Sequence, residues 1–142
     1  MPDDLYEVEH LVALPYGYRY TGAYNTDRKY VFGFKAIHKE PAEVILRIFQ
    51  LYADGLSPAK IAEALNAEGI GGPRGLKWRD TTIRGDRTRR TGILNDEIYI
   101  GRSRVPGRGY DLAYALQIVS DELWNRVKQR QGFAARGPVG TA

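Results

Sequence analysis

Residues 55–101 read GLSPAKIAEALNAEGIGGPRGLKWRDTTIRGDRTRRTGILNDEIYIG, and this stretch decides the organisation of the chain. It starts with a short capped helix, passes through a glycine-rich arm to Trp78, and enters a second helix start that is crowded with arginine. Two helices in this order are typical of helix-turn-helix-like domains, in which the second helix enters a groove of DNA. The stretch therefore predicts a DNA-binding element at residues 81–90.

Positive charge is concentrated in the same part of the chain. Residues 72–108 hold ten basic and four acidic side chains, whereas residues 1–71 hold seven basic and ten acidic ones. Nine of those ten basic residues are arginine, whose guanidinium pairs bidentately with phosphate and with guanine edges. The net charge of the whole chain is only +4, but the local excess of positive charge in residues 72–108 attracts a polyanion. A solvated basic face without a ligand is the alternative interpretation.

The composition excludes several kinds of site. The chain has 142 residues, 43% of them hydrophobic, which fits one folded domain with at most a small appendage. Because there is no cysteine, disulfides, thiolate zinc sites and thiol catalysis are excluded. The two histidines, His10 and His38, are far apart in sequence, so we expect no metal and no cofactor. No apolar run reaches the roughly 18 residues of a membrane span and no signal peptide opens the chain, which indicates a cytoplasmic protein.

The N-terminal part predicts a β-hairpin. Tyrosines alternate with other residues over 16–20, aromatic residues alternate again over 30–37, and residues 25–27 (Asn-Thr-Asp) supply turn chemistry. An aromatic ladder of this kind can stack single-stranded bases, so binding of RNA or single-stranded DNA is an alternative function. Packing of the rings across the strands and against a helix is the simpler explanation.

Apolar residues at helical spacing predict helices at about residues 41–53, 58–68, 81–90 and 120–131. Serines stand at N-cap positions of the second and the last helix, and short strands are expected at 99–105 and 114–119. The predicted fold class is α+β, with a helix-turn-helix-like helical core, a β-hairpin and a small antiparallel strand pair. The expected core residues are Val44, Ile45, Ile48, Phe49, Tyr52, Ile61, Ala62, Leu65, Trp78, Ile83, Ile93, Leu94, Ile98, Leu123, Trp124 and Val127.

Several ordered motifs resemble the recombinase domain of large serine recombinases, a family that includes phage integrases and transposon-borne site-specific recombinases. The motifs are PYGYR (15–19), EVILRIFQLYADGLSPAKIAEALNAEGI (43–70), PRG (73–75), WRDTTIRG (78–85), ILNDEIYIG (93–101) and IVSDELW (118–124). The resemblance implies a domain that follows a catalytic domain, precedes a zinc-ribbon domain and recognises half of an attachment site during DNA integration. The connection between the two reader helices, about a dozen residues, is longer than the three to four residues of an ordinary helix-turn-helix.

The resemblance also divides the chain. Residues 1–14 correspond to a linker or the end of a connecting helix, residues 15–131 to the DNA-binding domain, and residues 132–142 to a frayed tail. The family reaction needs a serine nucleophile in a domain of its own. Two of the three serines are predicted to be helix N-caps, and the third, Ser103, has no acid or histidine at motif spacing. We therefore expect this chain to be a non-enzymatic fragment of a serine recombinase, and a small nuclease is disfavoured because clustered carboxylates and histidines are missing.

The expected partners are double-stranded DNA and the catalytic and zinc-ribbon domains of the parent recombinase, with no membrane and no small-molecule substrate. A protein-interaction module of the recombinase assembly, using residues 1–12 or the last helix, is a further alternative. Base edges would be read by Thr82, Arg84 and Arg87. The candidates for phosphate contacts are Arg74, Lys77, Arg79, Arg89, Arg90, Arg102 and Arg104.

Overall fold

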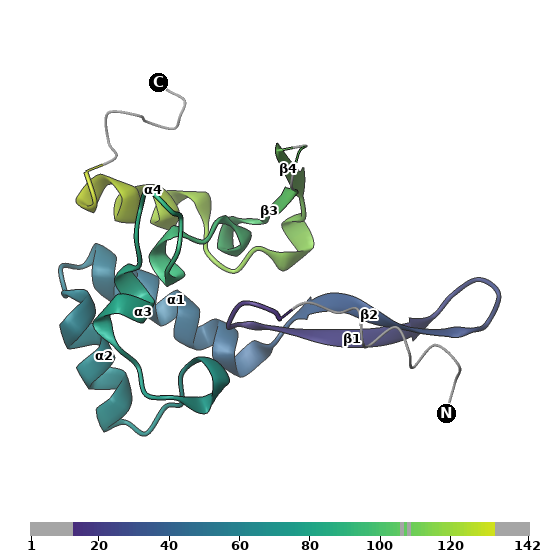
Figure 1. Ribbon diagram of the computed structural model, residues 1–142, viewed down its shortest axis with the longest axis horizontal. Coiled ribbons are helices and arrows are strands. Elements are labelled where there is room, and N and C mark those ends of the chain that lie inside the picture. Colours follow the sequence, from purple (N-terminus) through teal and green to yellow (C-terminus); the bar gives the residue numbers. More distant parts are fainter. Residues whose placement is uncertain (1–12, 106, 108, 133–142) are drawn as a thin grey trace.

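The computed structural model describes residues 13–105, 107 and 109–132, and these residues form an α+β fold (Figure 1). The predicted linker and tail at residues 1–12 and 133–142 lie outside them. A β-hairpin comes first, then the helices, then a small strand pair and a last helix. In chain order the helices and strands are β1 (Tyr18–Tyr24), β2 (Tyr30–Ile37), α1 (Lys39–Ala53), α2 (Pro58–Ala67), α3 (Asp80–Arg84), β3 (Arg102–Val105), β4 (Gly109–Leu112) and α4 (Asp121–Arg130).

Helices α1, α2 and α4 confirm the predictions from apolar spacing to within about two residues at each end. The caps also behave as expected. The Ser57 Oγ accepts a hydrogen bond from the Lys60 amide at 3.2 Å, and the Ser120 Oγ accepts one from the Leu123 amide at 3.1 Å. Gly55, with φ of 114°, adopts the left-handed conformation that lets the chain turn sharply between α1 and α2.

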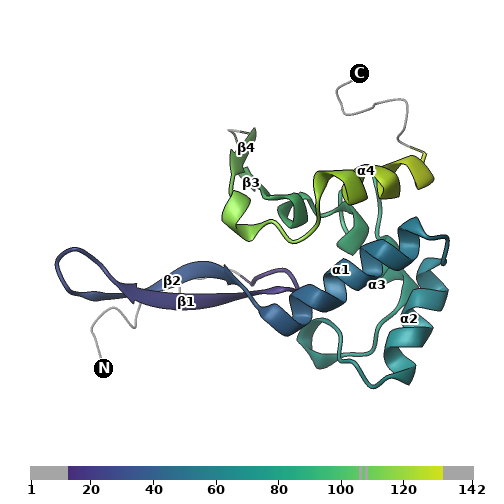
Figure 2. The ribbon, with the colours of Figure 1, turned by 180° about the vertical axis from the view of Figure 1, so that it is seen from behind.

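The β1–β2 hairpin projects away from the helices as a long two-stranded ribbon (Figures 1 and 2). The predicted turn is confirmed, because the Asn25 side chain accepts hydrogen bonds from the amides of Asp27 at 2.9 Å and Lys29 at 3.0 Å. Beyond the hairpin base the rings pair with each other rather than with a helix. The centroids of Tyr24 and Tyr30 are 5.4 Å apart, and Tyr24 remains 74% exposed.

The predicted helix at residues 81–90 is wrong beyond Arg84, where α3 ends. Gly85 follows with φ 57° and ψ −153°, a backbone conformation that is essentially restricted to glycine. A Cβ at this position would lie 1.9 Å from the Thr91 carbonyl oxygen, so the chain folds back on itself here. Residues 86 and 91 pair as an isolated antiparallel bridge instead of continuing a helix.

The second strand pair is also shifted from its predicted position. β3 begins at Arg102, after a 3₁₀ turn Glu97–Ile100, and its antiparallel partner β4 precedes the predicted strand at 114–119. The left-handed Gly101, with φ of 81°, ends the 3₁₀ turn and starts β3. Residues 118 and 119 do bond to the main chain, but both amides donate to the Tyr99 carbonyl, at 2.9 and 2.8 Å.

The core lies between α1, α2, α3 and α4 and includes most of the predicted residues. Phe49 of α1 stacks on Trp124 of α4 with ring centroids 5.8 Å apart, and meets Tyr99 edge-on at 5.9 Å. Val44 and Tyr52, expected in the core, are only partly buried at its margin, whereas Tyr18, Tyr99 and Val119 were not predicted and are buried. This core fixes the positions of α3 and of the chain that follows it.

Candidate nucleic-acid interface

The start of α3 is set by a clamp between α2 and Trp78. The Asn66 side chain accepts from the Trp78 amide and donates to the Trp78 carbonyl, each at 2.9 Å. Trp78 itself is buried, with its ring edge-on to Tyr16 at 5.1 Å. Ile83 is fully buried, so α3 packs against the core on one face and exposes Arg84 on another.

Residues 85–91, which we call the arginine loop, carry Arg87, Arg89 and Arg90 on a tight turn. Its neck is closed by main-chain hydrogen bonds from the Asp86 amide to the Thr91 carbonyl at 3.2 Å and from the Thr91 amide to the Asp86 carbonyl at 3.1 Å. The Asp86 carboxylate accepts the Thr88 amide at 2.9 Å, which shapes the tip. All three arginines are exposed, so the loop presents positive charge to solvent.

The candidate base readers do not share a helix face as predicted. Arg84 forms an ion pair with Asp80, four residues earlier on α3. Arg87 lies outside the helix, and its guanidinium donates to the Gln131 carbonyl at the end of α4. Arg89 lies 3.9 Å from the Asp86 carboxylate. Arg84 and the arginine loop are therefore brought together by a turn of the chain, rather than by helical periodicity.

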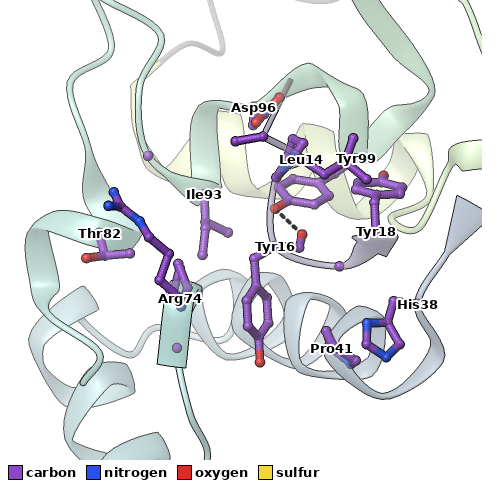
Figure 3. Close-up of a pocket in the computed structure, with 16 residues that line it drawn as sticks. Leu14, Tyr16, Tyr18, His38, Pro41, Arg74, Thr82, Ile93, Asp96 and Tyr99 are labelled. Carbon is purple, nitrogen blue, oxygen red and sulfur yellow. Dashed lines mark hydrogen bonds between the residues drawn. The ribbon is translucent and has the colours of Figure 1, made fainter. Parts of the chain in front are cut away.

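Two other candidates line a hollow of about 540 Å³ beside α3 (Figure 3). Arg74 and Thr82 lie on one side of it and His38 and Pro41 on the other. The sequence gives no signal for this hollow, because its walls come from segments that are far apart along the chain.

Polar groups that line the hollow make hydrogen bonds within the chain. The Tyr99 hydroxyl donates to the Tyr16 carbonyl at 2.6 Å (Figure 3). The Asp96 carboxylate accepts the Ile98 amide at 3.2 Å, and burial raises the pKa of Asp96. The Tyr99 hydrogen bond joins the N-terminal segment to the chain that follows the arginine loop, so it has a structural role.

The remaining phosphate candidates are spread over the surface. Lys77 and Arg79 are exposed on the connection that leads into α3. Arg102 and Arg104 lie on β3, well away from α3 in both ribbon views (Figures 1 and 2). The structure thus groups Arg84, the arginine loop and the connection before α3, and separates the β3 arginines from them.

Comparison with known proteins identifies the family. The Recombinase family model matches residues 39–131, which is more than half of the chain and includes α1 to α4. The chain belongs to the Recombinase family. No curated protein sequence matches it.

The Recombinase fold also appears in a solved structure described as "Crystal Structure of a LSR-DNA Complex", where LSR denotes a large serine recombinase. The TM-score is 0.54 with 19% sequence identity, and the match covers 89% of this chain and 33% of that one. The Recombinase chain described here thus spans about a third of the length of that recombinase. The resemblance read from the sequence motifs is confirmed at the level of family and fold.

The Recombinase domain shows two further properties within residues 13–105, 107 and 109–132. No cluster of three or more His, Asp or Glu side chains in this part of the chain is arranged to hold a metal ion. None of its helices has both the length and the apolar character needed to cross a membrane.

Lys128 is a cation that the sequence did not single out. It lies on α4, and its ammonium is 4.3 Å from the centroid of the Trp124 ring. Burial lowers the pKa of Lys128 to about 8, while the nearby charges of Glu97 and Arg87 act in opposite directions. A basic residue at helical spacing on a mostly polar helix resembles a solvated one, so no sequence signal distinguishes it.

Proposed function

We propose that this Recombinase domain binds double-stranded DNA sequence-specifically, at half of an attachment site, as one part of a site-specific serine recombinase that acts in the cytoplasm. The observation that carries the proposal is the display of Arg84, Arg87, Arg89 and Arg90 on α3 and the loop after it. These side chains are exposed, and the main chain that carries them is fixed at the neck of the loop, so few main-chain conformations are lost on binding. The fold is shared with a large serine recombinase whose structure is described as a DNA complex, which supports the same partner.

In this proposal the arginines divide into readers and positioners. Arg84, Arg87 and Thr82 contact base edges, and the other candidates neutralise phosphates and set the register on the duplex. The ion pair between Arg84 and Asp80 does not prevent this, because both side chains are about half exposed and such pairs contribute about 0–1 kcal/mol. Thr82 faces the hollow beside α3 and is the least accessible of the three.

The domain supplies binding, and the chemistry of strand exchange belongs to another part of the parent protein. Catalytic and zinc-ribbon domains are the partners that we propose for it. Because linked modules increase each other's effective concentration, the isolated domain binds a half-site weakly, and the affinity of the parent is much higher.

The decisive experiment compares Arg84→Ala with Arg47→Ala. Arg47 is a matched control, because it too is a helical arginine in an ion pair, with Glu68, and its side chain is 38% exposed, but it lies on α1. A preferred duplex is first selected from a random pool, and binding to it and to a scrambled duplex is measured by fluorescence anisotropy. We expect Arg84→Ala to lower the preferred-to-scrambled affinity ratio by a factor of about 5 to 150, which corresponds to 1–3 kcal/mol, and Arg47→Ala to leave it unchanged.

Two outcomes contradict the proposal in different ways. An unchanged ratio in Arg84→Ala removes α3 as the reader. A wild-type chain that selects no preferred duplex removes sequence-specific recognition altogether. If about four to six arginines neutralise phosphates, log K falls with log salt at a slope of roughly −4 to −5. An affinity that does not change with salt concentration contradicts the proposed phosphate contacts.

The exposed Tyr24 keeps a second candidate open, namely single-stranded nucleic acid on the β1–β2 hairpin. Stacking on an aromatic side chain contributes about 1–3 kcal/mol per base. A competition between duplex and single strand separates the two functions, since a hairpin reader prefers the single strand and loses this preference in Tyr24→Ala.

A further inference from the structure

Asn95 lies under the neck of the arginine loop and is a buried polar residue, with 6% of its surface exposed. Its Nδ2 donates to the Arg84 carbonyl at 3.0 Å and to the Thr91 carbonyl at 2.8 Å. These two carbonyls belong to the residues on either side of the turn that begins at Gly85. A single side-chain amide therefore ties the last residue of α3 to the last residue of the loop.

The other end of the Asn95 side chain faces α4. Its Oδ1 accepts hydrogen bonds from the Lys128 ammonium at 3.1 Å and from the Gln131 side chain at 3.2 Å. Lys128 also donates to the Leu94 carbonyl at 2.7 Å and to the Gln131 Oε1 at 2.9 Å. Because an ammonium can only donate, Oδ1 must face Lys128, and this leaves Nδ2 for the two carbonyls.

The contacts close into a ring through the tip of the loop. Arg87 donates to the Gln131 carbonyl, so α4 holds the loop tip as well as Asn95. The neck itself has little room for other contacts, because a Cβ on Gly92 would lie 2.5 Å from the Gly85 Cα. Two glycines in such close approach bring no side chain of their own to fix the neck, and the Asn95 side chain adds its contacts to the main-chain hydrogen bonds between Asp86 and Thr91.

We propose that Asn95 and Lys128 form a polar anchor that holds the arginine loop in its DNA-reading shape, so that both are positioning residues for sequence recognition although neither reaches the DNA. The inference rests on the proposed function only for its last step, since the anchor itself is a property of the free protein. A loop held in one shape offers Arg84 and Arg87 to fixed base edges, whereas a released loop keeps its charge and contacts phosphates in many arrangements. Releasing the anchor therefore lowers specificity more than general affinity.

The first test is made without DNA. Trypsin cleaves after arginine, so cleavage after Arg87, Arg89 and Arg90, identified by mass spectrometry, reports how often the loop opens. Asn95→Asp keeps the shape and the acceptor for Lys128 but places an oxygen against two carbonyl oxygens. We expect loop cleavage about tenfold faster than in the wild-type chain. Gln117→Glu is the matched control, because its amide also donates to a main-chain carbonyl, that of Val119 at 2.9 Å, and it is not among the residues that hold the loop. It is expected to leave cleavage at these arginines within about twofold.

The second test uses the selected and scrambled duplexes. We expect Asn95→Asp to lower the preferred-to-scrambled ratio about tenfold, while a new negative charge weakens both duplexes by a common factor that cancels in the ratio. Lys128→Met is the second variant, in case Asn95→Asp does not fold. It removes the donor on the α4 side and is expected to change both readouts in the same direction by about threefold.

The outcomes separate the anchor from the function. Unchanged loop cleavage in both Asn95→Asp and Lys128→Met overturns the anchor. Faster cleavage with an unchanged ratio overturns the positioning role, because the loop is then not a reader. If the wild-type chain shows no preference among duplexes, the proposed function fails, and with it the positioning role, while the cleavage assay still decides whether the anchor exists.

Discussion

Helices α1 and α2 and the arginine loop obtain their shapes from different forces. α1 and α2 bury Ile45, Ile48 and Leu65 completely, and a capped start follows the left-handed Gly55 between them. The arginine loop buries no large side chain, and its shape depends on glycine geometry and on the amide of Asn95. Helices α1 and α2 therefore provide stability, whereas the arginine loop presents charge. We expect that a substitution in one region leaves the property of the other unchanged.

The largest effect is expected when the apolar region is damaged. Leu65→Ala removes a fully buried side chain from the contact between α2 and the rest of the core, and we expect the free energy of unfolding to fall by about 3 kcal/mol. Urea denaturation measures this loss. Because the loop does not depend on this side chain, the preferred-to-scrambled DNA ratio of the folded protein stays the same, and a changed ratio shows that the two regions are coupled.

Gly85→Ala is expected to disrupt the arginine loop and not the apolar core. The added Cβ would lie 1.9 Å from the Thr91 oxygen on a backbone that side chains rarely adopt, so the neck must open at a cost of about 2 kcal/mol. Urea denaturation measures the loss of stability, and the trypsin assay measures the opening of the loop. Gly75→Ala is the matched control, because Gly75 also has a positive φ, 74°, but nothing lies within 4 Å of its added Cβ, and about 1 kcal/mol is expected. If both variants lose the same free energy of unfolding, the close packing at the neck does not make Gly85 more sensitive to an added Cβ than Gly75.

The smallest effect concerns Lys128 of α4, which contacts Trp124 in the core and Asn95 beneath the arginine loop. Its pKa is lowered to about 8 in the folded chain, below its ordinary value of 10.5, so the unfolded chain binds more protons between these values. Stability therefore rises with pH, by about 1.5 kcal/mol between pH 8 and 9.5. Above this window the pKa of Tyr99, raised by burial, acts in the opposite direction, because the unfolded tyrosine ionises first. Urea titrations of Lys128→Met are expected to show no rise of stability with pH over this window. If the rise persists in this variant, it belongs to another titrating group.

The sequence predicts those parts of the fold that follow from apolar spacing and caps. α1, α2 and α4 show stripes of apolar residues beside a capping serine or an early proline, so local information is enough to place them. The β-hairpin is predicted for the same reason, through alternating aromatics and the Asn25 turn. These elements need no knowledge of distant contacts.

The candidate site is predicted in its position but not in its shape. Arginines from 84 to 90 have the spacing of a helix face, and Gly85 within them was the signal that the helix stops. The fold-back also needs Gly92 and Asn95, which follow the loop, and α4, whose Lys128 and Gln131 are more than 30 residues away. Contacts of this kind leave no periodic pattern in the sequence. The DNA-reading roles of Thr82, Arg84 and Arg87 remain a proposal for the experiments above.

Tyr18 and Tyr99 have a consequence for the order in which the chain folds. The Tyr18 hydroxyl lies 3.1 Å from the Ile98 carbonyl oxygen and 2.6 Å from that of Leu116, and the Tyr99 hydroxyl bonds back to Tyr16. These contacts span about 80 to 98 residues, so we expect them to close large loops late, after local hairpin and helix contacts. During synthesis the Tyr18 hydroxyl meets both of its carbonyl partners only after residue 116 has left the ribosome. Force measurements on arrested nascent chains are expected to show the final docking of the hairpin base past that length.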